Sequence, residues 1–417
     1  MNYGLIAERL GHSFSKTVHS MIDNYDYTMR ELPKDEFDAF MTSRDFKGIN
    51  VTIPYKQDVI PYLDEISDTA KEIGAVNTIV NKDGKLCGYN TDFGGLWSLI
   101  LKNRIEIKNR KVLILGTGGT SKTAAAVAAT IGAREIIKLS RSGKDGAVTY
   151  EEAYERHADA DVIINTTPCG MFPKNEGIPC DIEKFQNLSG VVDVIFNPLQ
   201  TNLVLNAKKR GIKAAGGLYM LIAQAVLAAE KFTGKRYTES LTDKIYEKIL
   251  KDKQNIVLCG MPASGKTTVG KKIAEKLGRE FIDLDKEIVK NSGREITDIF
   301  AKDGEKYFRD LETEAAAENS QKTGAVISTG GGCVLREKNV MLLKQNGMLF
   351  FLDRPLCDLL PTDDRPLANS ADKIINLYKE RYHIYEKAAN TKIEVSGGID
   401  ETVSEVIEKF FNDGEYI

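Results

Sequence analysis

Residues 255–268 read NIVLCGMPASGKTT, a short apolar run followed by Gly260, four residues, Gly265, Lys266 and Thr267. This is the order of a phosphate-binding P-loop. Glycines let backbone N–H groups approach phosphate oxygens, the lysine supplies a positive charge, and the threonine hydroxyl can bind magnesium. A helix-like run, TTVGKKIAEKL, follows and would begin at the phosphates. The pattern favours a nucleotide-binding module in the C-terminal third over an ordinary glycine-rich turn.

The composition of the chain restricts the classes of protein that need to be considered. Its 417 residues are 42% hydrophobic, which is typical of a soluble protein of two or three domains. The 57 basic and 60 acidic residues are interspersed, so we expect no nucleic-acid partner. No apolar stretch has the length of a membrane span and the N-terminus does not resemble a signal peptide, so we expect no membrane association and a cytoplasmic location. The six cysteines are scattered, which predicts reduced thiols and no zinc site.

The chain alternates strand-like and helix-like runs, which predicts parallel α/β sheets throughout. A polar stretch at residues 248–254, KILKDKQ, marks a joint before the P-loop strand. A charged stretch at residues 101–110 marks a second break. We therefore expect three modules, at residues 1–100, 101–216 and 254–417.

The middle module begins with KVLILGTGGTSK at residues 111–122, a strand and glycine-rich turn that a helix follows. This is the first unit of a dinucleotide-binding fold, in a variant that has Ser121 at the third glycine position. The next strand ends at Ser140 and is followed by Arg141 and Ser142, where an NAD-preferring protein would carry an acidic residue. An arginine there favours the 2′-phosphate of NADP. The alternative is that Arg141 is a solvated surface charge.

Seven motifs in the first 225 residues closely resemble the shikimate dehydrogenase family. They are YGLIAERLGHSFSKTVHS (3–20), GINVTIPYK (48–56), GAVNT (74–78), GYNTDFGG (88–95), NTTPCGM (165–171), DVIFNPLQT (193–201) and GGLYMLIAQA (216–225). The last motif belongs to the site of the first module. The resemblance therefore implies that helices at about residues 217–250 return to complete that module.

Reducing a ketone by hydride needs a proton donor beside the carbonyl, and a lysine held by a carboxylate can serve. The resemblance assigns these roles in this chain to Lys56, the acid/base, and to Asp92, which binds and orients substrate. The resemblance also gives substrate contacts to Ser13, Ser15, Thr52, Asn77 and Gln224, and places Phe196 where tyrosine is more frequent. It gives NADP contacts to Gly116, Thr117, Gly118, Gly119, Thr120, Ser140, Arg141, Ser142, Met171, Val194 and Gly217.

The C-terminal module is similar to shikimate kinase across nearly the whole segment from residue 255 onward. After the P-loop come FIDLDKEI with Asp283 and Asp285, GEKYFRDLE with Arg309, STGGG with Gly331, DDRPL with Arg365, and KERYHIYEKAA with Arg381. One of the two aspartates can face the water shell of magnesium and the other the acceptor hydroxyl. The resemblance implies that Asp285, Arg309, Gly331 and Arg381 hold shikimate. It assigns ATP to Pro262, Ala263, Ser264, Gly265, Lys266, Thr267, Thr268 and the lid residue Arg365, with Thr267 and Asp283 serving Mg²⁺.

Together these resemblances imply an N-terminal α/β substrate domain with a Rossmann NADP domain, followed by a P-loop domain of the nucleoside-monophosphate-kinase type. We expect a bifunctional enzyme that uses NADPH to reduce 3-dehydroshikimate and MgATP to phosphorylate shikimate, two steps towards chorismate. One alternative is a dehydrogenase for quinate with NAD. Another is a C-terminal half that senses nucleotide or shikimate without turnover. The sequence carries no signal for oligomeric state, and free diffusion of shikimate between the sites is the default hypothesis.

Overall fold

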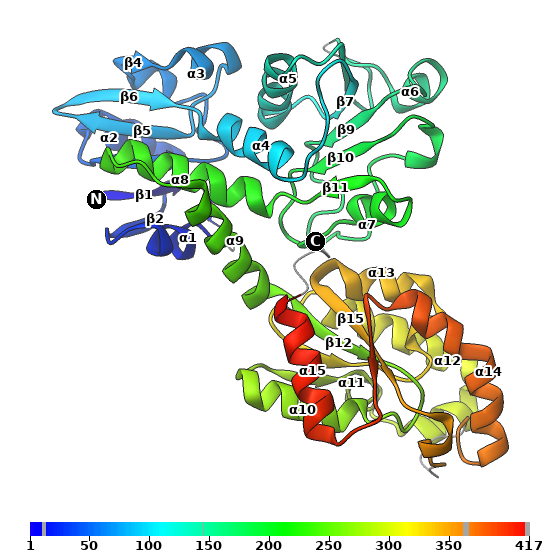
Figure 1. Cartoon of the computed structure of the whole chain (residues 1–417). Helices are drawn as coiled ribbons and strands as arrows, with labels where there is room; N and C mark the ends of the chain where they lie inside the picture. Colours follow the sequence, from blue (N-terminus) through cyan, green and yellow to red (C-terminus); the bar gives the residue numbers. More distant parts are fainter. Residues whose placement is uncertain (11–13, 145, 362–366, 413–417) are drawn as a thin grey trace. The chain divides into compact units, whose positions relative to one another are not determined.

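The computed structural model describes residues 1–10, 14–144, 146–361 and 367–412. By its internal contacts the chain divides into two compact units, each of which is described by itself (Figure 1). The first unit consists of Met1–Met171, Gly177–Asn197 and Asn206–Lys248. The second consists of Ile249–Ile417 with two short segments, Phe172–Glu176 and Pro198–Leu205. The three modules expected from the sequence stay a prediction.

The N-terminal sheet of the first unit is mixed. Its strand order is β2-β1-β3-β5-β6-β4, and β5 runs antiparallel to both β3 and β6. The expectation of parallel sheets throughout is therefore wrong here. One reason is the two-residue turn at Asp83 and Gly84 that joins β5 to β6, because its φ angles of 53° and 88° suit a tight hairpin. The elements are β1 (Tyr3–Ala7), α1 (Ser15–Ile22), β2 (Tyr27–Glu31), α2 (Lys34–Ser43), β3 (Gly48–Val51), η1 (Ile60–Tyr62), β4 (Glu65–Ile66), α3 (Asp68–Ile73), β5 (Thr78–Lys82), β6 (Lys85–Tyr89) and α4 (Thr91–Lys102).

The second sheet of this unit is entirely parallel, in the order β11-β10-β9-β7-β8. All five residues of β7 are buried, as in a strand covered on both faces. The strand order reverses at β7 and β9, and ligands of such sheets bind beyond the carboxyl ends of the strands at that point. The elements are β7 (Lys111–Leu115), α5 (Gly119–Ile131), β8 (Glu135–Leu139), α6 (Tyr150–Arg156), β9 (Val162–Asn165), η2 (Ile182–Lys184), β10 (Gly190–Asp193), α7 (Asn202–Lys209) and β11 (Lys213–Ala215).

Helix α8 (Leu218–Thr233) follows the second sheet in sequence and packs on the first. Its Phe232 lies in one apolar cluster with Leu5, Tyr27 and Val80. It also packs closely on α4, because a Cβ atom on Gly95 would lie 2.7 Å from the carbonyl oxygen of Met220. Figure 1 shows α4 and α8 between the two sheets of this unit. The next helix, α9 (Glu239–Lys253), includes most of the polar stretch that the sequence indicated as a joint.

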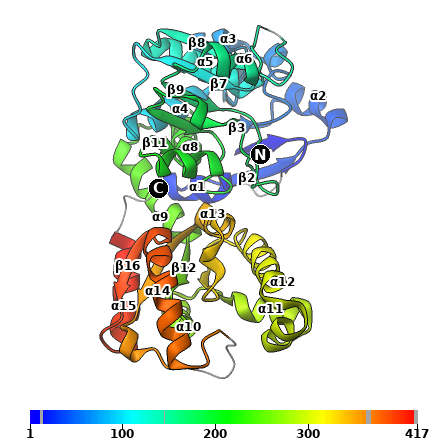
Figure 2. The same ribbon diagram turned by 90° about the vertical axis from the view of Figure 1, so that its right-hand side faces the viewer.

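The second unit has a parallel sheet in the order β13-β14-β12-β15-β16. The central strand β12 is buried along its whole length, and it leads directly into the P-loop. In the view of Figure 2, α11 and α12 lie on the side of the sheet away from β16 and α15. The elements are β12 (Asn255–Cys259), α10 (Lys266–Leu277), β13 (Phe281–Asp283), α11 (Leu284–Ser292), α12 (Ile296–Asn319), β14 (Val326–Ser328), η3 (Cys333–Leu335), α13 (Glu337–Asn346), β15 (Gly347–Asp353), η4 (Leu356–Asp358), α14 (Ala371–Ala388), β16 (Thr391–Glu394) and α15 (Ile399–Asn412).

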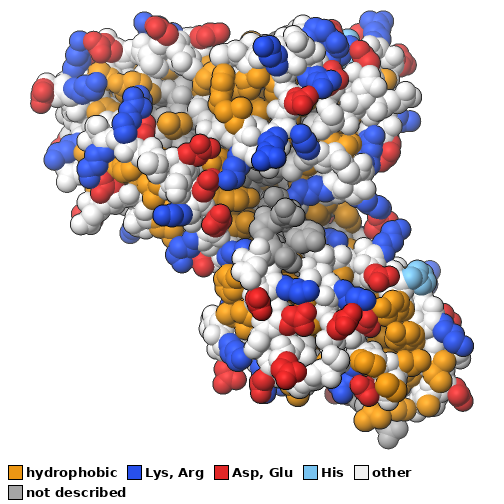
Figure 3. All heavy atoms as spheres, in the orientation of Figure 1, with side chains coloured by type: hydrophobic (Ala, Val, Ile, Leu, Met, Phe, Trp, Pro, Cys, Tyr) orange, Lys and Arg blue, Asp and Glu red, His pale blue; other side chains and the backbone are white. Residues whose placement is uncertain are grey.

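The distribution of charge on the surface agrees with the nearly equal numbers of basic and acidic residues. On the face shown in Figure 3, basic and acidic side chains are interspersed. Each of the six cysteines is a free thiol. Among the described residues no helix combines the length and the apolar character needed to cross a membrane.

Candidate active sites

A lysine and an aspartate meet in the first unit. The Nζ atom of Lys56 lies 2.6 Å from Oδ2 of Asp92, and the two side chains are 24% and 15% exposed. Lys56 is held by its neighbour Tyr55, which is buried and donates a 2.6 Å hydrogen bond to the carbonyl of Leu32. Asp92 lies in the first turn of α4, where helix N–H dipoles stabilise a carboxylate. The pair can therefore hold and deliver a proton in a partly desolvated place.

Asn77 and Gln224 both contact Thr91, the residue that precedes Asp92. The Oδ1 atom of Asn77 accepts hydrogen bonds from the Thr91 N–H at 2.7 Å and from the Thr78 hydroxyl at 3.1 Å. The Thr91 hydroxyl lies 3.4 Å from Oε1 of Gln224, on helix α8. The return of α8 thus brings Gln224 to a site from which it is far removed in sequence. The contribution of Thr91 was missed, although it directly precedes Asp92.

Thr52, Ser15 and Phe196, also expected to contact substrate, belong to the same unit. Thr52 follows β3, donates its N–H to Ile6 and accepts from the N–H of Tyr55, so it shapes the turn that carries Lys56. Within the described chain, its side chain makes no bond to Lys56 or Asp92. Ser15 is the first residue of α1. The rings of Phe14 and Phe196 meet edge to face at 5.7 Å. Ser13 lies outside the described residues.

The glycine turn after β7 leaves room for an anion. Helix α5 begins after Gly118 with no side-chain cap, and Cβ atoms added to Gly118 or Gly119 would meet nothing within 4 Å. Backbone N–H groups of the first turn can donate to a pyrophosphate, so the turn fits a dinucleotide. Ser121 is fully buried and donates a 2.7 Å hydrogen bond to the carbonyl of Gly118. This hydrogen bond therefore stabilises the turn, at the position where the usual dinucleotide-binding motif has its third glycine. Gly116 has φ 107°, and Thr117 and Thr120 flank the opening.

The residues expected near the 2′-phosphate and the nicotinamide lie at the carboxyl edge of the same sheet. Arg141 and Ser142 are exposed after β8, and Ser140 accepts a 3.0 Å hydrogen bond from the Gly143 N–H. Met171 is 45% exposed. A Cβ atom on Gly217 would lie 2.1 Å from the carbonyl oxygen of Val194, so only glycine fits at this contact.

The P-loop of the second unit is formed as expected. Helix α10 begins after Gly265, whose φ is 93°, with no side-chain cap. The Nζ atom of Lys266 donates hydrogen bonds of 3.0 and 2.8 Å to the carbonyls of Gly260 and Met261. The hydroxyl of Thr267 donates a 2.8 Å hydrogen bond to Oδ2 of Asp283. Ser264 is fully buried, and its hydroxyl has no hydrogen-bond partner among the described residues. The loop is thus arranged to receive phosphate.

A cavity of about 890 Å³ joins the P-loop to the expected acceptor residues. Asp285 lies in the first turn of α11, and its carboxylate converges with that of Glu312 on Gly330. A Cβ atom on Gly330 would lie 2.4 Å from Asp285 Oδ1 and 2.7 Å from Glu312 Oε1. The lining includes Pro262, Ala263, Gly265, Lys266, Thr267, Thr268, Asp283, Asp285, Arg309, Gly331 and Arg381. Arg365 lies outside the described residues.

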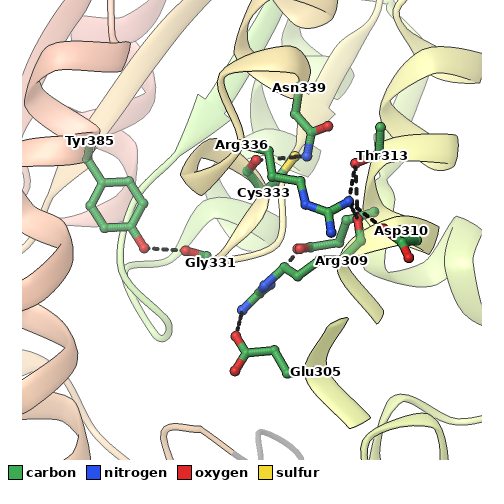
Figure 4. A network of polar contacts seen from close by, with 10 residues as sticks. Glu305, Arg309, Asp310, Thr313, Gly331, Cys333, Arg336, Asn339 and Tyr385 are labelled. Carbon is green, nitrogen blue, oxygen red and sulfur yellow. Dashed lines mark hydrogen bonds and ion pairs between the residues drawn. The ribbon is translucent and has the colours of Figure 1, made fainter. Parts of the chain in front are cut away.

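A polar network holds Arg309 at this cavity. Its guanidinium contacts Glu312 at 2.5 Å and Glu305 at 2.6 Å, both in the part of α12 beyond the break at Gly304. Figure 4 shows the contact with Glu305. Arg336 donates hydrogen bonds of 2.9 and 2.7 Å to the carbonyl of Arg309 and to Asp310. Figure 4 also shows Tyr385 donating to the carbonyl of Gly331. A Cβ atom at position 332 would lie 1.9 Å from Arg309 Nη1, so a side chain there would displace the guanidinium.

The carboxyl of Glu312 is the most perturbed group of the cavity. Burial raises the pKa of Glu312 to about 7, against the opposing effect of Arg309. Its Oε1 atom has no hydrogen-bond partner in the described chain. The sequence motifs did not indicate Glu305 and Glu312, although their spacing of four and three residues from Arg309 on a helix is that of contacting side chains.

The cavity could hold a divalent cation through few protein ligands. Within the described ranges no group of three or more His, Cys, Asp or Glu side chains is placed to bind a metal. The Thr267 hydroxyl and the Asp283 carboxylate are oxygen ligands of the kind that Mg²⁺ takes together with water and phosphate. The donor set therefore fits a magnesium ion that arrives with a nucleotide.

Comparison with known proteins identifies the first part of the chain. Residues 5–79 match the family model described as the shikimate dehydrogenase substrate binding domain. The shikimate dehydrogenase (NADP(+)) of Clostridium beijerinckii is 38% identical over 261 residues, which cover 58% of this chain and 96% of that protein. The chain belongs to the shikimate dehydrogenase family.

Solved structures of the family agree with this fold. A chorismate mutase/shikimate 5-dehydrogenase fusion protein from Clostridium acetobutylicum is 36% identical, with a TM-score of 0.56. The match covers 59% of this chain and 96% of that one. Shikimate 5-dehydrogenase of Thermus thermophilus, solved in complex with NADP(H) and shikimate, is 26% identical, with a TM-score of 0.54 and coverage of 60% and 99%.

The family accounts for the first part of the chain only. Residues 262–411 match a second family model, described as shikimate kinase. The chain therefore joins a protein of the shikimate dehydrogenase family to a shikimate kinase domain.

Proposed function

We propose that this protein is a bifunctional enzyme that reduces 3-dehydroshikimate to shikimate with NADPH and phosphorylates the 3-hydroxyl of shikimate with MgATP. The observation that carries the proposal is the presence in one chain of a shikimate dehydrogenase fold and a shikimate kinase domain. The product of the first reaction is the substrate of the second. The proposed compartment is the cytoplasm, where free thiols such as exposed Cys357 stay reduced.

In the first half, Lys56 serves as the general acid and Asp92 holds it. NADPH supplies a hydride to the carbonyl carbon when bound. The Lys56 ammonium then gives its proton to the carbonyl oxygen, and the reverse reaction returns the proton to Lys56. The 2.6 Å contact between Lys56 and Asp92 supports this assignment, as does their partial withdrawal from water. Asn77 and Gln224 offer neutral hydrogen-bonding groups to the hydroxyls of the substrate.

NADP is the proposed dinucleotide of the first half. The relatives carry NADP(+) in their names, and the uncapped start of α5 leaves space for a pyrophosphate. The exposed Arg141 lies at the strand end from which a side chain reaches the ribose, and a guanidinium suits a phosphate dianion.

In the second half, the cavity brings nucleotide and acceptor residues together. ATP supplies the phosphoryl group when bound at the P-loop, and Mg²⁺ neutralises its charge. Lys266 and the N–H groups of the loop hold the phosphates, and Thr267 with Asp283 supports the metal. Arg309 and Arg381 bind the carboxylate of shikimate. Asp285 accepts the proton of the attacking hydroxyl.

The test follows both reactions in one sample. Purified full-length protein receives 3-dehydroshikimate and NADPH, with and without MgATP, while NADPH, ADP and shikimate 3-phosphate are measured. We expect NADPH to be consumed in both samples and the phosphate ester to appear only with MgATP. Removing magnesium with a chelator should stop ADP formation and leave NADPH oxidation in place.

Two outcomes would select the alternatives. Faster turnover of quinate with NAD than of shikimate with NADP would assign the first half to quinate. Binding of ATP and shikimate without ADP formation would make the second half a sensor. The cavity that unites Lys266 with Asp285 and Arg309 favours catalysis over sensing.

A further inference from the structure

One arginine at the kinase cavity has no role in the function proposed so far. Arg354 directly follows β15 and lines the cavity together with Pro262, Ala263 and Lys266. Its Nε atom is buried without a hydrogen-bond partner, and its guanidinium makes no ion pair with the described residues. Burying part of a guanidinium without a partner costs free energy. A ligand could lower this cost by supplying a hydrogen-bond acceptor.

Two other cations of the cavity have partners within the protein. Arg309 contacts Glu305 and Glu312, and Lys266 donates to the carbonyls of the P-loop. The residue before Arg354 points elsewhere, because Oδ2 of Asp353 accepts a 2.9 Å hydrogen bond from Tyr382 and lies 3.6 Å from Lys392. Arg354 is therefore not held by the carboxylate beside it in sequence.

The sheet topology separates Arg354 from the acceptor. Strand β12, which leads into the P-loop, has β14 and β13 on one side and β15 and β16 on the other. Asp285 follows β13 and Gly331 follows β14, so these two acceptor residues belong to the first side. Figure 2 shows α11 and α12 on that same side. Arg354 follows β15 and belongs to the opposite side.

The end of β15 lies directly against the P-loop. A Cβ atom on Gly260 would be 2.8 Å from the carbonyl oxygen of Leu352, two residues before Arg354. Parallel strands present their carboxyl ends at one edge of the sheet, so Arg354 enters the cavity at the level of the phosphate-binding loop. An anion held by the P-loop, such as the phosphate chain of a nucleotide, would therefore lie close to Arg354.

We propose that Arg354 binds the phosphate chain of the nucleotide from the β15 side of the P-loop. The inference rests on the proposed binding of ATP by the second half and adds a residue that no sequence motif indicated. A guanidinium donates two hydrogen bonds at once to phosphate oxygens, which a lysine does not. Arg354 therefore contributes affinity for di- and triphosphates and none for shikimate.

The test measures binding by calorimetry on the full-length protein. The variants are R354Q and R354K, and the ligands are MgADP, magnesium tripolyphosphate and shikimate. In R354Q, loss of a charged hydrogen bond to phosphate should lower the affinity for MgADP and for tripolyphosphate by about tenfold to a hundredfold. R354K should recover part of the affinity, and shikimate affinity should not change.

The controls separate a lost contact from a lost fold. K379Q removes one positive charge from the exposed face of α14 and should bind MgADP like the wild type. The rate of NADPH oxidation by the same polypeptides should be unchanged in R354Q, because Arg354 is not part of the dehydrogenase site.

Three results would overturn the inference. The first is an unchanged affinity of R354Q for MgADP. The second is weaker binding of MgADP with unchanged binding of tripolyphosphate, which would place the contact at the ribose or base. The third is weaker binding of shikimate. Calorimetry needs no turnover. A wild-type protein that binds MgADP but phosphorylates no shikimate would therefore contradict the proposed kinase reaction and leave the assignment of Arg354 testable.

Discussion

At the scale of single residues, the cavity of the second half depends on an uneven balance of charge around Arg309. The guanidinium is buried and contacts two carboxylates, one half exposed on Glu305 and one almost fully buried on Glu312. Solvent screens the charge of Glu305 but not that of Glu312. Whether Glu312 is ionised therefore decides how much positive charge Arg309 can offer to an anionic substrate.

We predict that shikimate affinity falls as the pH rises through about 7. Burial raises the pKa of Glu312 to about 7, so the carboxyl is neutral below that pH and negative above it. A negative Glu312 competes with the substrate carboxylate for Arg309, so binding takes up a proton, and affinity should fall by at most about tenfold per pH unit. Calorimetric titrations of shikimate from about pH 6 to about pH 9 would measure this slope.

Two variants provide the matched comparison. E312Q removes the ionisation and should give a nearly flat profile, whereas E305Q removes a half-exposed carboxylate and should keep the slope of the wild type. An equally steep profile in E312Q would show that another group titrates.

The same shift predicts a change in stability. The pKa of Glu312 is raised from its ordinary value of 4.5 to about 7 on folding. Its contribution to the free energy of unfolding is therefore full below pH 4.5 and is lost as the pH rises through about 7. Thermal unfolding from acid to neutral pH should show a loss in the wild type that is smaller in E312Q.

Lys56 offers the sharpest test in the first half. K56M removes the proton donor and keeps a side chain of similar length, so kcat for NADPH oxidation should fall by about a hundredfold to ten-thousandfold. ADP formation from added shikimate by the same polypeptide should not change, which serves as the control for folding. A fall of less than a few-fold would assign the proton transfer to another group.

At the scale of the elements, the two helices that follow the glycine-rich turns start in the same way. Helices α5 and α10 begin after Gly118 and Gly265 with no side-chain cap, whereas α3 and α4 are capped by Ser67 and Asn90. A side-chain cap would occupy the N–H groups that an anion needs. The missing caps are therefore consistent with phosphate binding at both helices.

We predict that G118A weakens NADPH binding, whereas G217A lowers the stability of the fold. Gly118 has φ −73° and open space around its Cβ position, so alanine should fold normally and raise the KM for NADPH several-fold. At Gly217 the new Cβ would lie 2.1 Å from the Val194 carbonyl, so alanine should lower the free energy of unfolding by about 1–3 kcal/mol. Thermal unfolding and NADPH titration of both variants would separate the two effects. Equal unfolding temperatures would contradict the steric argument.

At the scale of the whole molecule, the two reactions are expected to share shikimate through solution. K56M should lack the first activity and K266A the second. If shikimate diffuses freely, a mixture of the two variants should form shikimate 3-phosphate from 3-dehydroshikimate at close to the wild-type rate once shikimate accumulates. Following NADPH, ADP and the ester in the mixture would measure this. A long lag in the mixture that the wild type lacks at equal concentration would point to direct transfer.

Much of the fold was predictable because its signals are local. The P-loop and the turn after β7 require glycines at fixed spacing, and the strands before them are short apolar runs that end at those glycines. The mixed first sheet was predicted wrongly, although Asp83 and Gly84 carried a hairpin signal. Parallel pairing was inferred from alternation alone, and alternation does not fix the direction of a strand.

The sequence by itself determined the identity of both halves and the residue types of their sites, because those depend on ordered motifs along the chain. Only the tertiary structure decided which groups meet. It placed Gln224 beside Thr91 and Asn77, buried Glu312 against Arg309, and brought Arg354 to the P-loop cavity with its Nε atom unpaired among the described residues. Burial and contact between residues far apart in sequence arise from packing. A side chain acquires a raised pKa or an unpaired donor only when neighbouring elements exclude water from it.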